Sequence, residues 1–255
     1  KALTGYMKGV ISNNTLSPYW STAYDAILDT YMGKKPESFT YNGKTYTPHS
    51  FKAFLGIKQS DYISITSYTH HPFYSQFALE IPDNWRWAGS YNLPMDEMME
   101  AIDHALLNGY TVAWATDVSE AGFSRQGFAI VPDENAVENA GTDQAKWLGL
   151  SDAERKGNIN GKIGTEILKE KEITQEMRQE GYNNYQTTDD HGMHIYGIAK
   201  DQNGNKYYMV KNSWGNTGPY EGLWYASEAF VQYKTMSIVL NEASLPREIA
   251  KKINL

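Results

Sequence analysis

The chain has 255 residues, of which 41% are hydrophobic and 13% aromatic, and these proportions exclude a disordered chain. The formal net charge is −7 without a strongly basic stretch, so we expect no binding to nucleic acid through its phosphates. No apolar run approaches the roughly 18 residues of a membrane span. The absence of cysteine excludes disulfides and thiolate metal ligands within the chain and leaves its compartment open.

Turn and capping signals organise the first part of the chain. A helix is predicted over 17–31, because a capping Ser and a Pro open it and apolar residues share one face. Residues 41–46 are typical of a hairpin with Asn-Gly at its turn, and a short helix is predicted to follow over 48–55. Residues 62–68 alternate like a strand.

The clearest helix is predicted over 94–107. Pro94 stands at its start, acidic residues occupy its first turn, and Gly109 lies just past its end. An apolar strand over 110–115 follows at once, so we expect this helix and strand to pack together.

The second half combines one more helix with several strands. Residues 133–160 are polar and are predicted to be an irregular insertion, and a charged amphipathic helix is predicted over 165–180. The predicted strands are 193–200, 206–212, 222–225 and 235–240, the first two joined by a turn at 201–205. Helices followed by antiparallel strands indicate an α+β fold.

The predicted hairpin brings a histidine and an asparagine together. Folding the chain about 202–204 places His191 opposite a residue near 215, within a few positions of Asn212. An amide oxygen that accepts a hydrogen bond from one imidazole nitrogen fixes the tautomer and frees the other nitrogen for catalysis. Trp214 is placed to cover that bond, so the pair is typical of the base and orienting residue of a catalytic triad.

A metal centre at this hairpin is the less favoured alternative. His191 and His194, beside Asp189 and Asp190, are three positions apart, and on a strand such side chains point to opposite faces. A strand-end histidine with no chemical role is a further alternative. His70-His71-Pro72 is interpreted as an exposed loop, and residues 201–205 as a turn rather than a calcium loop. We therefore expect no metal site.

Two motifs carry a family resemblance. Asp190-His191-Gly192-Met193 and Lys211-Asn212-Ser213-Trp214-Gly215 resemble the His and Asn motifs of papain-like cysteine peptidases, and more closely those of the bleomycin hydrolase/aminopeptidase C branch. Segments 91–94 and 109–118 resemble the helix and strand that precede the His in that branch. The resemblance covers most of the chain and is least clear over 133–160.

The resemblance implies a papain-like α+β fold, with an accessory region over 1–90 and the papain-like domain over 91–255. By that likeness His191 is the general base and acid, Asn212 orients it, and Trp214 shields the pair, with Asp190 and Gly192 in support. It implies hydrolysis of peptide substrates by a thiol without a cofactor, an aminopeptidase-like specificity and a ring-like homo-oligomer. It also implies a cytoplasmic location, or an exported one if a signal peptide precedes Lys1.

Two departures from the family pattern leave alternatives open. The chain has no cysteine, so three alternatives are open: a Cys-bearing N-terminal segment is missing from it, a serine replaces the thiol, or the protein is a catalytically dead module for peptide binding or assembly. The last residues, 245–255, do not resemble the family's C-terminal arm, whose terminal carboxylate receives the amine of the substrate. Exopeptidase and endopeptidase action therefore both stay open.

Overall fold

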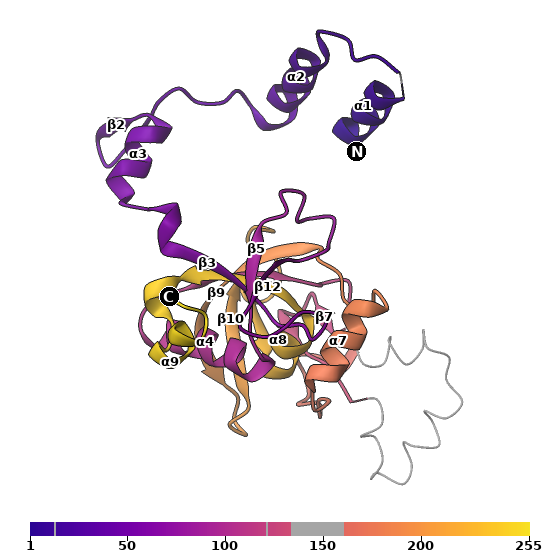
Figure 1. Cartoon of the computed structure of the whole chain (residues 1–255), viewed down its shortest axis with the longest axis vertical. Helices are drawn as coiled ribbons and strands as arrows, with labels where there is room; N and C mark the ends of the chain where they lie inside the picture. Colours follow the sequence, from indigo (N-terminus) through magenta and orange to yellow (C-terminus); the bar gives the residue numbers. More distant parts are fainter. Residues whose placement is uncertain (13, 121, 134–160) are drawn as a thin grey trace. The chain divides into compact units, whose positions relative to one another are not determined.

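The computed structural model describes residues 1–12, 14–120, 122–133 and 161–255 (Figure 1). The chain divides into two compact units, Lys1–Lys58 and Gln59–Leu255. The irregular insertion predicted over 133–160 lies, apart from its first residue, outside the described residues.

The first unit consists of short elements with little burial. Its elements are α1 (Ala2–Ile11), α2 (Trp20–Met32), β1 (Phe39–Tyr41), β2 (Lys44–Tyr46) and α3 (Pro48–Leu55). The predicted hairpin is confirmed: Asn42 and Gly43 both have positive φ at its turn, as a two-residue loop requires. Thr47 caps α3 in a reciprocal pair with Ser50. Helix α2 begins at Trp20, later than predicted, and neither α1 nor α2 contains a buried residue.

The second unit is built on one ten-stranded sheet, in the order β4-β5-β3-β12-β6-β9-β10-β11-β8-β7. Its strands are β3 (Tyr62–Thr66), β4 (Gln76–Ala78), β5 (Gly89–Asn92), β6 (Val112–Thr116), β7 (Phe123–Ser124), β8 (Phe128–Ala129), β9 (His191–Lys200), β10 (Lys206–Lys211), β11 (Leu223–Ser227) and β12 (Thr235–Asn241). Neighbouring strands are antiparallel except for β3 with β5 and β8 with β11. The α+β class is therefore confirmed. The sheet also contains strands from the first half of the chain, beginning with β3 at residue 62.

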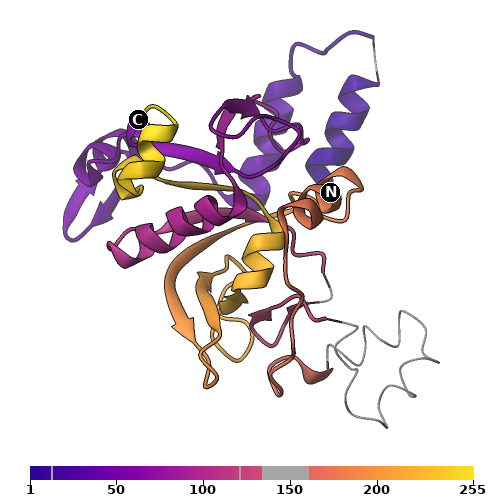
Figure 2. The same ribbon diagram turned by 60° about the horizontal axis from the view of Figure 1, so that its bottom comes forward.

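Helices cover this sheet and close its core. They are α4 (Met95–Leu107), α7 (Gln175–Asn183), α8 (Glu228–Lys234) and α9 (Arg247–Lys252), with single turns of 3-10 helix at η1 (Gln59–Asp61) and η3 (Glu242–Ser244). Figures 1 and 2 both show α4 and α8 lying against the sheet, and one apolar cluster joins them with α9 and the central strands.

Helix α4 follows its sequence signals closely. Pro94 is its N-cap residue, and Gly109 follows its end with a φ of +80°. Met98 and Ile102 are fully buried, and Val112 of the next strand lies in the same cluster. The spacing of apolar residues thus predicted both the helix and the face that it buries.

The helix predicted over 165–180 is wrong in its first part. Helix α7 begins only at Gln175, after Thr174 accepts a hydrogen bond from the Met177 amide. The preceding segment lies beside the chain near Val131, where the Lys171 amide donates to the Val131 carbonyl. Glu170 accepts from the Val131 amide and from Ser227, and these tertiary hydrogen bonds outweigh the helical propensity of the segment.

The structural division at 58/59 falls earlier than the expected boundary at 90/91. Residues 62–66, 76–78 and 89–92 are strands of the large sheet, so they belong to the second unit by hydrogen bonding. An accessory role for the first part of the chain stays a prediction.

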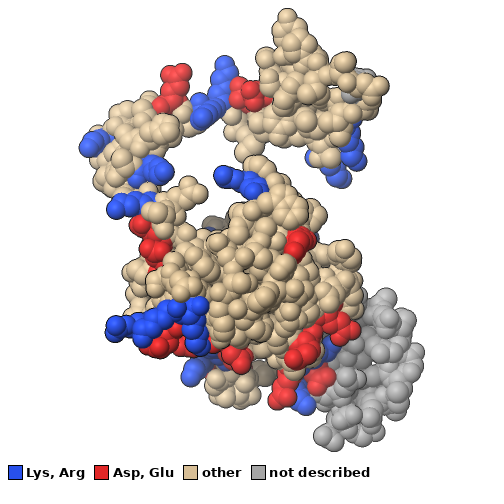
Figure 3. Space-filling model, viewed as in Figure 1, with Lys and Arg blue, Asp and Glu red and all other residues tan. Residues whose placement is uncertain are grey.

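Two surface properties complete the description. Among the described residues, every helix is too short or too polar to cross a lipid bilayer. On the face of the second unit that Figure 3 shows, basic and acidic side chains lie side by side.

Candidate active site

The β9–β10 hairpin carries the candidate residues. Asp201 holds its turn, because its Oδ1 accepts hydrogen bonds from the amides of Asn203 (2.8 Å) and Asn205 (2.9 Å). Gly204 has a φ of +87°, a conformation that side chains rarely adopt. The same acidic side chain therefore explains the turn without any bound cation.

A bulge in β9 sets the register of the hairpin at its far end. Near the turn Lys200 lies opposite Lys206, but the register shifts by one residue between Met209 and Val210. Beyond the shift His194 lies opposite Lys211, and continuing that register places Trp214 opposite His191. Asn212 is then two positions from the residue opposite His191, on the same face of the hairpin. Without the bulge it would be three positions away and would point to the other face.

His191 and Asn212 are joined by a hydrogen bond. His191 Nε2 lies 2.8 Å from Asn212 Oδ1, and the Ser213 amide donates to the same oxygen at 2.7 Å. Because that oxygen is held as an acceptor, His191 donates from Nε2 and leaves Nδ1 as its free ring nitrogen. Asn212 is only 2% exposed, and its Nδ2 has no hydrogen-bond partner among the described residues.

Trp214 covers this pair. Its ring centroid lies 5.1 Å from that of the His191 imidazole, and edge contacts with Phe123 (5.9 Å) and Trp224 (5.7 Å) hold the indole in place. Trp224 is itself fixed by donating to the Ser124 carbonyl. An apolar ring over the amide–imidazole bond limits competition from water.

The residues that flank His191 have different surroundings. Asp190 accepts from the Val118 amide at 2.9 Å and so ties the entrance of β9 to the end of β6. Burial raises the pKa of Asp190, the bond from Val118 opposes this, and the carboxyl of Asp117 raises it further. A Cβ added at Gly192 would meet no described atom within 4 Å, so the chain is open to approach there.

Asp189 is the most perturbed carboxyl beside the site. Burial, together with the nearby carboxyls of Asp83 and Asp190, raises the pKa of Asp189 to about 6. Its side chain lines a small cavity with Leu79 and Ile81. A carboxyl of this kind protonates in mildly acidic solution, two residues ahead of His191.

The structure assembles a second histidine group that sequence spacing missed. His191 and His194 form no cluster of ligand atoms with Asp189 and Asp190 in the part of the chain described. His70 and His71 do: their ring nitrogens lie within 4.8 Å of the carboxylate of Glu80 and of each other. Glu80 is nine and ten residues further along, beyond β4, so only tertiary structure reveals the group.

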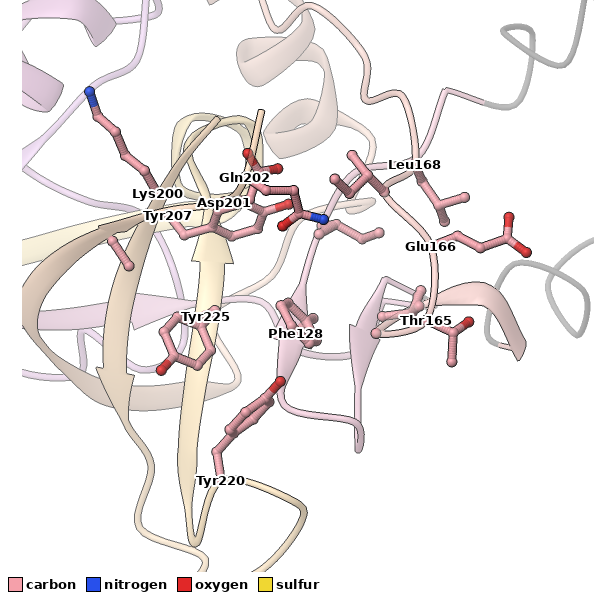
Figure 4. A pocket seen from close by; sticks show the side chains of 15 residues that line it. Phe128, Thr165, Glu166, Leu168, Lys200, Asp201, Gln202, Tyr207, Tyr220 and Tyr225 are labelled. Carbon is pink, nitrogen blue, oxygen red and sulfur yellow. The ribbon is translucent and has the colours of Figure 1, made fainter. Parts of the chain in front are cut away.

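A cavity lined by aromatic rings lies away from the His191–Asn212 pair. It has a volume of about 450 Å³ and is bordered by the rings of Phe128, Tyr207, Tyr220 and Tyr225 (Figure 4). It also touches residues 199–202, at the opposite end of β9 from His191. At about 3.3 Å per residue, that strand separates cavity and candidate pair by nearly 30 Å. The cavity is therefore not part of the His–Asn site.

Known proteins support the resemblance read from the motifs. The model of the Peptidase C1-like family matches residues 133–255. Aminopeptidase C of Streptococcus thermophilus is 24% identical over 212 residues, which cover 80% of this chain and 41% of that protein. The crystal structure of PepW from Lactobacillus rhamnosis superposes with a TM-score of 0.62 at 19% identity, covering 92% of this chain and 49% of that one.

These matches confirm the resemblance to the papain-like peptidases of the aminopeptidase C/bleomycin hydrolase branch, and the fold likeness to PepW agrees with the α+β class. They support a peptidase function. The chain spans about two fifths of the curated relative and about half of the solved structure.

Proposed function

We propose that this chain supplies the general base and the orienting amide of a papain-like cysteine peptidase, whose thiol lies on a segment outside these 255 residues. The observation that carries the proposal is the His191–Asn212 hydrogen bond of 2.8 Å. It leaves His191 Nδ1 free on a strand end that the sheet holds rigid, beneath the Trp214 ring. A nucleophile–base–orienter triad requires this arrangement of its last two members.

The residues present define the proton transfers of the reaction. The thiolate attacks the peptide carbonyl carbon, and His191 Nδ1 donates a proton to the leaving amine as the C–N bond breaks. A water molecule then gives its proton to the same nitrogen and attacks the thioester, and the C–S bond breaks to restore the thiolate. Asn212 keeps Nε2 engaged throughout, and as a neutral amide it serves both protonation states of the imidazole.

The likeness to an aminopeptidase supports a proposal for the substrate class. We propose cleavage of peptides near a free amino terminus, in a protein that assembles as a homo-oligomer. The segment 245–255 contains α9 and buries Ile249 and Ile253 in the core.

The first test is the coding sequence immediately upstream of Lys1. A Cys followed by Trp at the start of an apolar helical pattern, with a Gln before it, would support the proposal. A start codon directly before Lys1, or Ser, Ala or Gly in place of that Cys, would overturn it in favour of a peptide-binding scaffold.

The second test measures the thiol in the full-length protein. The rate of alkylation by iodoacetamide, measured against pH, reports the pKa of the thiol. We expect a pKa below the ordinary thiol range, because an imidazolium beside a thiol stabilises the thiolate. His191→Ala should move that pH profile toward the ordinary thiol range, whereas His194→Ala, an exposed change on the same strand, should leave it in place. Identical profiles for the two variants would remove His191 from the site.

A further inference from the structure

A second histidine site lies in the loop between β3 and β4. His70 Nε2 is 3.1 Å from Glu80 Oε2, and His71 Nε2 is 2.8 Å from Glu80 Oε1. Two imidazoles thus direct the same ring nitrogen to the two oxygens of one carboxylate. The three side chains are partly exposed, so the site is open to solvent on one side.

Aromatic packing fixes the orientation of both imidazoles. The His71 ring stacks on Phe77 of β4 at 4.1 Å, and the His70 ring stacks on Tyr182 of α7 at 5.0 Å. Tyr182 also donates to the Glu80 carbonyl at 3.3 Å. The convergence is therefore held by a strand and a helix, and does not depend on the loop alone.

Gln179 supports the distal nitrogen of His70 with either of its two amide atoms. His70 Nδ1 lies 3.2 Å from Gln179 Nε2 and 3.4 Å from Gln179 Oε1. The side-chain amide of Gln179 is itself held in place: its Nε2 donates to Asn183 Oδ1, and its Oε1 accepts from the Thr69 backbone amide. The amide can therefore donate to Nδ1 when Nε2 carries the proton, or accept from it when Nε2 is bare.

We propose that His70, His71 and Glu80 bind one divalent transition-metal ion of the Zn²⁺ class. Two imidazole nitrogens and one carboxylate oxygen are a ligand set that zinc takes, with water in the fourth position. Ligand atoms of tetrahedral zinc are about 3.3 Å apart at the usual bond lengths, close to the two separations seen here. Gln179 provides the outer-shell contact that a metal-bound imidazole requires.

The competing explanation is a metal-free pair of hydrogen bonds. Burial alone would raise the pKa of Glu80, but hydrogen bonds from His71 and His70 lower it, so the carboxylate is ionised and ready to accept. In that state both Nε2 atoms carry protons, whereas metal binding requires them bare. The two explanations predict different results for zinc: a metal site binds it tightly, and a metal-free pair of hydrogen bonds does not.

The experiment titrates ZnCl₂ into the protein by calorimetry, with CoCl₂ as a spectroscopic probe of tetrahedral coordination. We expect one tightly bound equivalent and the visible absorption of tetrahedral Co²⁺, with CaCl₂ and MgCl₂ not competing, because those ions prefer oxygen ligands. His70→Ala and His71→Ala should abolish this binding. Gln179→Met, which keeps length and removes the amide, should weaken it roughly 10- to 100-fold.

Matched controls separate this site from other histidines. His49→Ala changes an exposed histidine of the first unit, and His191→Ala changes the candidate catalytic one, and both should retain the tight equivalent. Circular dichroism confirms folding, and Glu80→Gln, nearly isosteric, should also lose the Co²⁺ spectrum. Absence of tight zinc binding, or binding that survives His70→Ala and His71→Ala, would overturn the proposal.

Discussion

The two histidine sites use the same side chain in opposite ways. At His191 a neutral amide holds one nitrogen, an indole covers the bond, and the other nitrogen is free. At His70 and His71 two nitrogens converge on one carboxylate, and a second amide supports the distal nitrogen of His70.

The difference shows that the partner of the engaged nitrogen decides what an imidazole can do. A single imidazole with one nitrogen held and one free can move a proton, so it suits a general base. Two imidazoles that converge on one carboxylate present their Nε2 lone pairs to one point once the Nε2 protons are lost, which suits a cation. Sequence context alone does not distinguish the two cases, since both are short runs rich in His.

The largest effect should follow from removing the free nitrogen of His191. In the full-length protein His191→Ala should lower kcat/KM on aminoacyl-coumarin substrates by ~10³-fold, because both proton transfers are lost. His194→Ala, exposed on the same strand, should stay within about twofold of the parent. Activity close to the parent in His191→Ala would end the comparison, because neither site would then contain a base.

Removing the orienting amide should have a smaller effect. Asn212→Ala should lower kcat roughly 10- to 100-fold, since a misplaced base loses part of its advantage while substrate contacts remain. KM should change little. A kcat equal to that of the parent would show that Trp214 and the sheet position His191 without the amide.

Helix α7 carries Gln179, which contacts His70, and Arg178 anchors this helix to the rest of the unit. This buried side chain donates to the Ser67 carbonyl at 2.7 Å and the Gln232 carbonyl at 2.9 Å, and packs on the Tyr68 ring. Arg178→Ala should lower the free energy of unfolding by ~3 kcal/mol, through a cavity and unpaired carbonyls. Denaturant unfolding measures it, with exposed Arg247→Ala as the control expected to change little.

The smallest effect concerns Asp189 and pH. Its pKa is about 6 in the folded protein against an ordinary 3.8, so the native state binds more protons than the unfolded state between about pH 4 and 6. Stability therefore falls as pH rises through that window. The full shift would correspond to ~3 kcal/mol, but the carboxyl is partly exposed and solvent screens it, so Asp189→Asn should stabilise the protein by about 1 kcal/mol at pH 7.

Unfolding curves at pH 4 and pH 7 test this expectation. The gain from Asp189→Asn should be present at pH 7 and absent at pH 4, where the aspartate is protonated in the folded protein. Asp25→Asn, on the exposed face of α2, serves as the control. An equal gain at both pH values would show that charge at Asp189 is not the cause.

Local sequence signals predicted those elements in which capping, charge and apolar spacing all indicate the same structure. Helix α4 was predicted because its cap, its acidic first turn and its methionine spacing all indicate the same structure. The closeness of His191 and Asn212 along the hairpin was predicted because a short turn pairs the two strands, but the bulge that puts them on one face was not predicted. Their catalytic roles stay a prediction, since they rest on the family likeness.

Tertiary contacts decided what the sequence left hidden. Residues before Gln175 have a helical pattern, yet their backbone bonds to the chain at Val131. Glu80 and Gln179 contact His70 from 10 and 109 residues further along the chain, so no local sequence spacing predicts that site. The bulge in β9 lies beside Gly197, and this isolated glycine within a strand is the local signal that could have indicated it.

That bulge has a consequence for transplanting the pair onto another scaffold. Twenty positions lie between His191 and Asn212 in the sequence, and a regular hairpin with this turn would put the two side chains on opposite surfaces. Copying both residues and the turn, but not the extra residue in the strand, would reproduce the motif and separate the partners. A scaffold must therefore reproduce the register that places both side chains on the same face of the hairpin, and a motif search does not record that register.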